Sequence, residues 1–434
     1  MGNYDFSLDL ESKNTMSVIN GWIKEGSRVL EFGPANGRLT KYLKEEKHCR
    51  MTIVEIDAET GKEASAYAEK AYLGQEGDIE NYHWTGEREP FDAIIFADVL
   101  EHLRDPERVM REAAALLKPE GELLVSVPNI THNSILIGLI NDQFDYDDTG
   151  LLDRTHVHFF SYDSFVKMCG RCNTKIVEMT PIYSRVGDNE IPTCWREVPA
   201  VLERELRKRA HGGVYQYVYR ICRGESTLPI CTQLPEVMPG EDRASFEMQL
   251  YYRNGQEDYT EEKCIRSVYH DGEEVLVTLD LTDKGSVSEL RFDPMAESGL
   301  VELISATIED ASGTKVLQPR VNSASVVWNR WYLFRENDPR MFFRFPQEMQ
   351  RGKVMLRFRL SEYRIDGDHA DLIGSLLAER NMEVELLRKE NAEAADYVRR
   401  MEKEVQELKN RMEKEVQELK NRKGLFQGRG SRRG

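Results

Sequence analysis

The first 225 residues alternate short apolar runs with stretches of helical periodicity. Runs such as "RVLEF", "CRMTIVEID", "FDAIIFADVL" and "GELLVSVPN" are separated by amphipathic segments such as "RLTKYLKEE" and "PERVMREAAALL". This alternation is typical of a parallel sheet with helices on both faces. Two later runs, "KIVEM" and "YQYVYRICR", add further strands. We therefore predict an α/β domain over residues 1–225, built on a Rossmann-like, doubly wound sheet.

A different pattern begins after residues 226–243, a proline-containing stretch without periodicity that we interpret as a linker. Beyond it, apolar and polar residues alternate, as in "EVLVTLDL" and "KVMLRFRL". Period-2 runs separated by turn residues predict an antiparallel β-sandwich over residues 244–362.

Residues 371–422 repeat apolar side chains at steps of three and four, which is the pattern of a coiled coil. Asn391 falls at an a position among valines, and a lone buried asparagine favours a parallel, two-stranded coil. We therefore predict a homodimer, followed by a basic tail over 423–434. The seam comprises Ile373, Leu377, Val384, Leu387, Ala394, Val398, Met401, Val405, Leu408 and Met412, with Arg380 and Asn391 in its two gaps.

Composition narrows the classes of function. The 434 residues carry a formal net charge of -17, which weighs against nucleic acid as the main partner. Cys169 and Cys172 form a CxxC without a second pair nearby, so reduced thiols are expected instead of a zinc site. Neither a signal peptide nor a membrane-spanning apolar run is visible. We expect a cytoplasmic protein, whose basic tail would allow contact with the inner membrane.

The stretch "VLEFGPANGRLTKYL", residues 29–43, passes from a strand to a helix through a turn with two glycines. Its spacing is acid-x-Gly-x-x-x-Gly, formed by Glu31, Gly33 and Gly37, and Pro34 stiffens the turn. Because glycine has no side chain, the backbone of this turn allows close approach of a nucleotide-like ligand. The neighbouring motifs must decide which ligand it is, because a lone glycine pattern is weak evidence.

Two further acids follow at intervals that suit an adenosine. Glu55 ends the second strand, where a carboxylate can accept hydrogen bonds from both ribose hydroxyls. Asp78 could accept from an adenine amino group, and Ile79 could pack on the ring. In isolation either Glu31 or Asp78 could equally be a helix cap or a surface acid.

Together with the later stretch "LKPEGELL" these make four motifs, and in this order they resemble the class I S-adenosylmethionine-dependent methyltransferases over residues 20–225. The resemblance implies that the glycine turn lies under the methionine part of S-adenosylmethionine. It places Glu55 at the ribose and Asp78 with Ile79 at the adenine. It also implies that the backbone around Ala97 faces the cofactor sulfur, and that "YQYVYRICR" is the family's final antiparallel strand.

The segment that follows the fifth strand carries the candidate acceptor chemistry. Its "GLLDRTH" resembles a stretch of bacterial methyltransferases that accompany glycosyltransferases in surface polysaccharide synthesis, which implies a sugar hydroxyl as acceptor. His156 or His102 is the candidate base, since neutral imidazole suits proton removal near pH 7, and Asp153 could orient it. Equally, His156 could be a satisfied core residue. We interpret the acidic "FDYDD" as a solvated loop and assign no metal ligands.

The remaining segments leave three hypotheses open. Residues 289–310 look like part of the β-sandwich modules attached to bacterial polysaccharide glycosyltransferases, which suggests such an enzyme as partner. Trp328, Trp331 and Tyr332 could stack on sugar rings or form the sandwich core. The chain is then a glycan O-methyltransferase, a methyltransferase for a small-molecule or phosphate acceptor, or a coiled-coil scaffold with a weak cofactor site.

Overall fold

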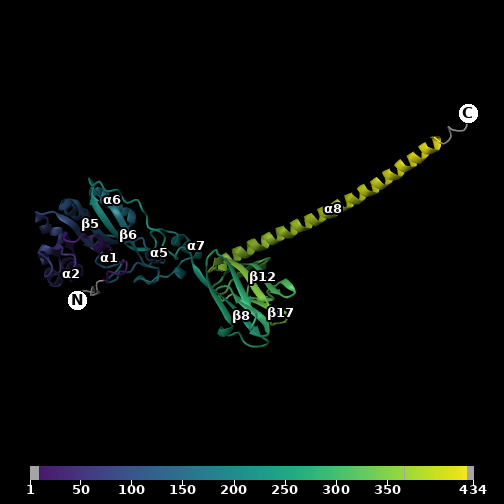
Figure 1. Cartoon of the computed structure of the whole chain (residues 1–434), viewed down its shortest axis with the longest axis horizontal. Coiled ribbons are helices and arrows are strands. Elements are labelled where there is room, and N and C mark those ends of the chain that lie inside the picture. Colours follow the sequence, from purple (N-terminus) through teal and green to yellow (C-terminus); the bar gives the residue numbers. More distant parts are fainter. Residues whose placement is uncertain (1–8, 366, 428–434) are drawn as a thin grey trace. The chain divides into compact units, whose positions relative to one another are not determined.

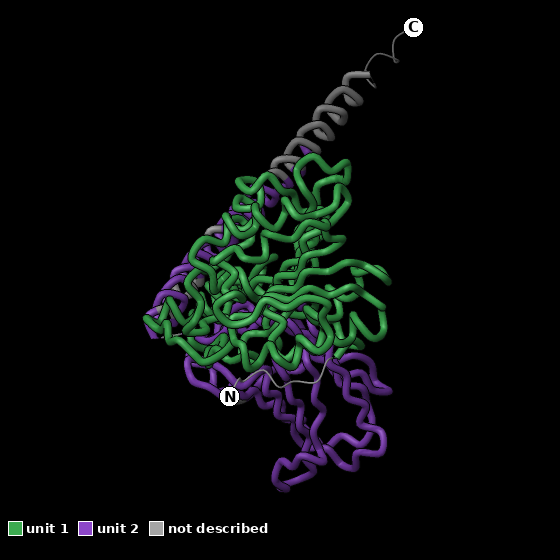
Figure 2. Tube along the Cα trace, turned by 90° about the vertical axis from the view of Figure 1, so that its left-hand side faces the viewer, with its two compact units in different colours: residues 1–245 green, residues 246–434 purple. Residues whose placement is uncertain are grey.

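The computed structural model describes residues 9–365 and 367–427. The chain divides into two compact units, unit 1 over residues 1–245 and unit 2 over residues 246–434 (Figure 2). Among the described residues, no helix is both long and apolar enough to cross a bilayer.

Unit 1 is built on a seven-stranded sheet in the order β3-β2-β1-β4-β5-β7-β6; Figure 1 labels β5 and β6 of this sheet. The first five strands are parallel, whereas β7 runs antiparallel to both β5 and β6. This confirms the predicted doubly wound sheet and its antiparallel strand at "YQYVYRICR". The strand order reverses between β1 and β4, and ligands of such sheets bind at this point, outside the carboxyl ends of the strands. The strands are β1 (Arg28–Phe32), β2 (Arg50–Glu55), β3 (Lys70–Leu73), β4 (Phe91–Ala97), β5 (Leu117–Pro128), β6 (Thr174–Tyr183) and β7 (Val214–Arg223).

Helices cover both faces of this sheet. One apolar cluster packs α4 and α6 against Ile94, and the other packs α1 and α2 against Ile95. Because successive side chains of a strand point to opposite faces, these clusters form two separate layers of core. The helices are α1 (Thr15–Trp22), α2 (Arg38–Glu45), α3 (Ala58–Ser65), α4 (Pro106–Ala115), α5 (Asn133–Ile140), α6 (Tyr162–Arg171) and α7 (Ala200–Arg207), with short 3-10 turns η1 (Gly74–Gly77), η2 (Ile79–Asn81), η3 (His83–Gly86), η4 (Leu100–His102) and η5 (Trp195–Glu197).

Residues 226–243, which the sequence indicates as a linker, carry neither helix nor strand but are bound to unit 1. The Cys231 amide donates to the Ile176 carbonyl at 2.9 Å, and the Tyr183 hydroxyl donates to the Glu236 carbonyl at 2.9 Å. This segment therefore contributes side chains to the surface of unit 1.

Unit 2 contains two antiparallel sheets, as the alternating pattern predicts. Side chains in β10 alternate strictly between exposed and buried. The Phe358 ring of one sheet lies 4.9 Å from Phe292 and 5.1 Å from Tyr269 of the other, so the two sheets share a core. The elements are β8 (Ser245–Asn254), η6 (Glu261–Lys263), β9 (Cys264–His270), β10 (Glu274–Asp280), β11 (Val287–Asp293), β12 (Gly299–Asp310), β13 (Gly313–Val316), β14 (Val321–Asn322), β15 (Val326–Trp328), β16 (Trp331–Phe334), β17 (Met341–Met349) and β18 (Lys353–Tyr363).

The aromatic cluster of unit 2 divides between core and surface. Tyr332 is only 5% exposed and pairs with Val301 in the sheet, so it belongs to the core. Trp328 and Trp331 face each other across the β15–β16 hairpin and are half-buried. Stacking on a sugar is therefore open to the tryptophans but not to Tyr332.

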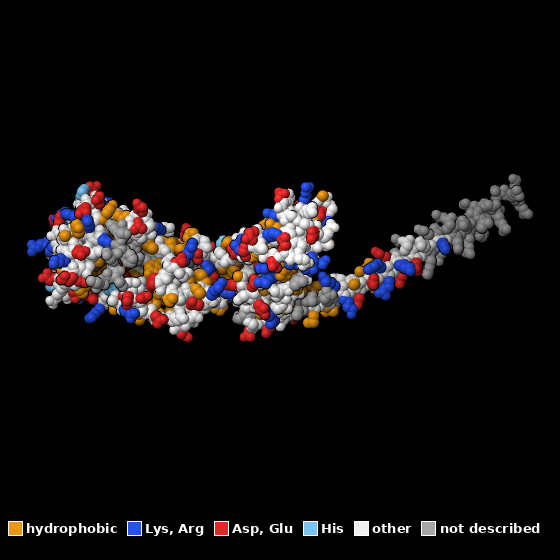
Figure 3. All heavy atoms as spheres, turned by 90° about the horizontal axis from the view of Figure 1, so that it is seen from below, with side chains coloured by type: hydrophobic (Ala, Val, Ile, Leu, Met, Phe, Trp, Pro, Cys, Tyr) orange, Lys and Arg blue, Asp and Glu red, His pale blue; other side chains and the backbone are white. Residues whose placement is uncertain are grey.

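The C-terminal element is one continuous helix, α8 (Gly367–Gln427), of 61 residues (Figure 1). Its first turns differ from the predicted seam, because Ile373 packs against the buried Leu333 and Ala370 of unit 2. Farther along, the seam residues Leu387, Val398 and Met401 are 51%, 53% and 41% exposed. Figure 3 shows side chains of both charges on the described part of the helix. The side chains of Leu377, Val405, Leu408 and Met412, and residues 428–434 of the basic tail, lie outside the described residues.

Candidate functional site

The glycine turn between β1 and α2 uses left-handed backbone conformations at three places. The φ angles are +62° at Gly33, +48° at Ala35 and +79° at Gly37. A Cβ at Gly33 would lie 3.0 Å from the Val99 side chain, whereas a Cβ at Gly37 would lie 2.5 Å from Ala64 of α3. Gly37 is therefore required for helix packing, a reason that the ligand argument from sequence did not include. Pro34 closes the turn by accepting from the Gly37 amide at 2.9 Å.

Two buried acids hold this turn in place. At the end of β2, the Glu55 carboxylate accepts from the amides of Ala35 at 3.0 Å and Asp57 at 2.9 Å. Each carboxylate oxygen has a second acceptor position, so Glu55 can still bind ribose hydroxyls. Glu31 is 3% exposed and accepts from the Thr40 hydroxyl at 2.6 Å. Burial raises the pKa of Glu31 to about 7, and the nearby Glu55 adds to this shift.

The predicted adenine residues lie at the same edge of the sheet. A Cβ at Gly77 would come within 2.0 Å of the Glu55 carbonyl oxygen, so the chain before Asp78 runs directly against the end of β2. The Asp78 carboxylate caps η2 by accepting from the Glu80 amide at 3.0 Å. Ile79 is half-buried against the core, and Ala97 is half-buried at the end of β4. The structure thus brings the predicted cofactor residues together, while Asp78 also has the capping role considered from sequence.

A second polar group follows β4, and sequence reasoning missed it. Asp98 has a φ of +56°, and its amide donates to the Ser126 hydroxyl at 3.0 Å. Its carboxylate accepts from Ser126 at 2.8 Å and from the amide nitrogen of Gln216. Gln216 in turn accepts from Thr15 at 2.6 Å. Burial of its carboxyl group raises the pKa of Asp98, although the residue as a whole is exposed.

The three predicted catalytic residues form one connected cluster. The rings of His102 and His156 lie 4.8 Å apart at 67°. Asp153 accepts from the Thr155 hydroxyl at 2.6 Å, and that hydroxyl lies 3.0 Å from Nδ1 of His102. The Thr155 carbonyl, 3.3 Å from the same nitrogen, can only accept. His102 is therefore protonated at Nδ1, which leaves a lone pair on Nε2.

The environment of His156 keeps its imidazole neutral. The residue is 9% exposed, and burial, followed by the neighbouring His102, lowers its pKa, while Asp153 opposes this shift. His156 can thus offer a lone pair near neutral pH.

Glu101 is the most unusual member of this group and was not predicted. It is 1% exposed, and within the described part of the chain neither carboxylate oxygen has a hydrogen-bond partner. Burial, reinforced by Asp98, raises its pKa well above the usual range of a glutamate. One potential ligand atom each of Glu101, His102 and His156 lie within 4.8 Å of one another. Two imidazoles and a carboxylate are a donor set that suits a divalent transition metal.

Comparison with known proteins matches the domain that carries this site. Residues 12–179 match the family model of a methyltransferase domain. Unit 1 is an S-adenosylmethionine-dependent methyltransferase domain. A relative described as ubiquinone biosynthesis O-methyltransferase, from Coxiella burnetii, is 26% identical over 170 residues, which are 38% of this chain and 71% of the relative. A relative of the same description from Xanthomonas campestris is 26% identical over 121 residues, 27% of this chain and 50% of the relative.

Among solved structures, the magnesium protoporphyrin IX methyltransferase of Synechocystis with bound SAH is 16% identical. It covers 48% of this chain and 81% of its own, with a TM-score of 0.32, which is too low to support an argument about this chain.

The methyltransferase domain fits its cofactor at the glycine turn. Gly33 carries no side chain beside Val99, and Glu55 and Asp78 keep free acceptor positions near the adjoining strand ends. When bound, S-adenosylmethionine supplies a methyl group on a sulfonium centre. The protein must then align the acceptor atom with this methyl group and take up a proton where the acceptor carries one.

Proposed function

We propose that the chain is an O-methyltransferase that acts on a sugar hydroxyl of a bacterial surface glycan or of its precursor. The observation that carries this proposal is the pair of imidazoles, His102 and His156, beside Asp98 at the carboxyl edge of the sheet. A hydroxyl must lose its proton as it is methylated, and a neutral imidazole is suited to accept that proton near pH 7. The description of the relatives as O-methyltransferases supports an oxygen acceptor.

A sugar is favoured by the aromatic surface next to His156. The rings of Phe144, Tyr146 and Phe159 lie within 6.5 Å of one another, and His156 lies 6.2 Å from Phe159. Phe144 and Tyr146 are 37% and 47% exposed, so they could stack on the apolar face of a sugar ring. The "GLLDRTH" resemblance over residues 150–156 points to the same acceptor class.

In the proposed mechanism, Nε2 of His102 accepts the proton of the sugar hydroxyl. Thr155 holds the proton on Nδ1, and the Asp153 carboxylate holds Thr155 and stabilises the imidazolium that forms. Asp98 and Gln216 offer an acceptor and a donor that can orient neighbouring hydroxyls. His156 completes the same cluster and is the alternative base.

Two alternatives follow from specific observations. The unpaired Glu101, with His102 and His156, could hold a divalent cation that polarises the hydroxyl in place of a general base. Sensitivity of the methyl transfer to a chelator, with rescue by added metal, distinguishes this mechanism from a general base.

The ubiquinone-related description of the relatives favours a small-molecule phenol as the competing acceptor.

The proposal is tested by incubating the full chain with methyl-labelled S-adenosylmethionine and a panel of glycans, glycan precursors and phenols. We expect label in the glycan class and its loss in His102→Ala. His158→Ala is the matched control, because His158 is in the same segment and bonds the Arg104 carbonyl instead of the cluster. Labelling of the phenols alone would refute the glycan acceptor. Binding of cofactor without labelling of any acceptor would favour the scaffold hypothesis.

We further propose that α8 joins two copies of the chain in a parallel coiled coil in the cytoplasm, and that a glycosyltransferase is a partner. The exposed Leu387, Val398 and Met401 support the coil, because aliphatic side chains on a helix gain stability only when another helix covers them. Asn391 is exposed in the single chain and would pair with its own copy in an in-register dimer.

A further inference from the structure

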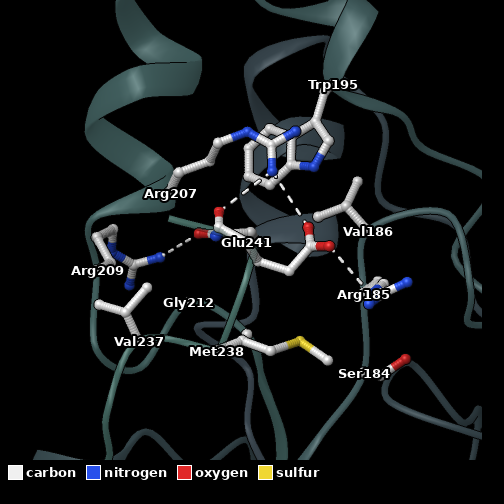
Figure 4. Close-up of a pocket in the computed structure, with 12 residues that line it drawn as sticks. Ser184, Arg185, Val186, Trp195, Arg207, Arg209, Gly212, Val237, Met238 and Glu241 are labelled. Atoms are coloured by element: carbon white, nitrogen blue, oxygen red, sulfur yellow. Dashed lines mark hydrogen bonds and ion pairs between the residues drawn. The ribbon is translucent and has the colours of Figure 1, made fainter. Parts of the chain in front are cut away.

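A cationic pocket lies in unit 1 outside the cluster of histidines. It is formed where the end of β6, the turn after α7 and the start of β7 meet residues 237–241 (Figure 4). Three arginines line it, in a chain whose formal net charge is -17. They are Arg185, Arg207 and Arg209.

One carboxylate bridges two of these arginines. Glu241 lies 3.0 Å from Nε of Arg185 through one oxygen and 3.1 Å from Nη1 of Arg207 through the other (Figure 4). Arg207 is 9% exposed and is held in place by the Trp195 ring, 4.3 Å from its guanidinium carbon, and by Glu203 at 2.8 Å. Guanidinium groups fixed in this way are suited to bind a phosphate, whose oxygens can bridge them as the Glu241 oxygens do.

The charges of the pocket do not balance. Arg209 donates to the Thr131 carbonyl at 3.1 Å and to the Asn133 side-chain oxygen at 2.8 Å, both of which are neutral. Within residues 9–365 and 367–427, Arg209 forms no ion pair. Among the residues that line the pocket, three are arginines and Glu241 alone is acidic, so the lining is cationic and would be more so without Glu241.

The pocket lies within reach of the acceptor site. Gly213 lines it, and Gln216, three residues farther along β7, donates to Asp98. Three residues of extended chain span about 10 Å. A phosphate one or two sugar units away from the methylated hydroxyl could therefore reach the arginines.

We propose that this arginine pocket binds a phosphate or diphosphate group of the acceptor, and that Glu241 occupies the anion position when the acceptor is absent. This inference rests on the proposed function, because it makes the acceptor a phosphorylated or diphosphate-linked sugar. A role limited to fastening residues 237–241 is the competing explanation. Under that explanation both substitutions only loosen this segment, since Arg185 loses its ion pair with Glu241 and Glu241 loses its pairs with Arg185 and Arg207, and neither substitution should tighten pyrophosphate binding.

Calorimetric titration of the full chain with inorganic pyrophosphate tests the proposal without requiring turnover. Arg185→Gln should weaken binding about tenfold or more, because a charge-assisted contact is lost. Glu241→Gln should instead tighten binding, because the competing carboxylate is gone. Arg171→Gln is the matched control, since Arg171 is 56% exposed, close to the 55% of Arg185, and pairs with Glu107 elsewhere in unit 1. The proposal would be overturned if Glu241→Gln left the affinity for pyrophosphate unchanged or weakened it. It would also be overturned if no form of the chain bound pyrophosphate.

A second arm identifies the source of the phosphate. With an acceptor that is turned over, Arg185→Gln should raise KM and leave kcat unchanged, and removal of the acceptor's phosphate should have the same effect. If pyrophosphate binds as expected but KM does not change, the pocket binds a free anion and the acceptor assignment is wrong. Failure of methyl transfer itself would refute the proposed function while the calorimetric result still stands.

Discussion

Glu55→Ala is the substitution that tests the cofactor site most directly. In the free chain the Glu55 carboxylate accepts from the amides of Ala35 and Asp57, and each of its oxygens keeps a second acceptor position for the predicted ribose. Two hydrogen bonds to a charged acceptor, at about 1.5 kcal/mol each, amount to about 3 kcal/mol of binding free energy. This loss corresponds to roughly a 150-fold increase in Kd. Any loosening of the glycine turn would add to it.

The assay is calorimetric titration of full-length chain with S-adenosylhomocysteine, which binds without turnover. Asp57→Ala is the matched control, because Asp57 also accepts from backbone amides, of Glu59 and Thr60, but caps α3 instead of facing the ribose. The control should lose only about 1 kcal/mol of folding stability and bind normally. Circular dichroism establishes that each variant is folded. A Kd for Glu55→Ala within threefold of the unsubstituted chain would refute the placement of Glu55 at the ribose.

Three further predictions concern other parts of the chain. The pKa of Glu31 is raised from 4.5 to about 7 in the fold, so the fold loses stability as pH rises from the first of these values to the second. Glu31→Gln should therefore raise the Tm at pH 8 and change it little at pH 5, with a gain of about 3 kcal/mol in the free energy of unfolding. His102→Ala or His156→Ala, whichever removes the base, should lower kcat by about 10²–10⁴ with cofactor affinity intact. If His156 is the base, kcat/KM should stay constant as the pH falls to the usual pKa of histidine and should decrease only at lower pH, because the pKa of His156 is lowered. Light scattering should show a dimer for the full chain and a monomer after deletion of residues 367–434, and Asn391→Val should strengthen association and relax the choice between two and three strands.

The residues that the sequence predicts for the cofactor lie at one edge of the sheet because each stands at or shortly after the end of a parallel strand. Gly33 follows β1, Glu55 ends β2 and Asp78 follows the short turn after β3, and parallel strands of one sheet bring such positions to one edge. Asp98 also follows a strand, but its partner Gln216 is 118 residues away. No spacing rule connects residues so far apart. The one feature of the sequence that could have identified Asp98 is its position as an acid directly after a buried apolar run.

Burial explains the other differences between prediction and structure. Glu101 stands in "DVLEHL" as an ordinary polar residue, and only the fold shows that both of its oxygens are enclosed without a partner. Ile373 fits the heptad by spacing, yet the apolar cluster around Leu333 lies within reach and covers it first. Periodicity identifies the apolar face of a helix but does not tell which surface covers that face.

The reversed direction of β7 accounts for how the acceptor side is assembled. In a parallel strand the last residues reach the carboxyl edge of the sheet, and Arg223 would lie there. Because β7 runs antiparallel to β5, its first residues reach that edge instead. Gln216 thereby meets Asp98, and Gly213 enters the arginine pocket. One short strand segment therefore joins the proposed site of methyl transfer to the proposed phosphate site, so substitutions in residues 213–216 should alter both acceptor KM and pyrophosphate binding.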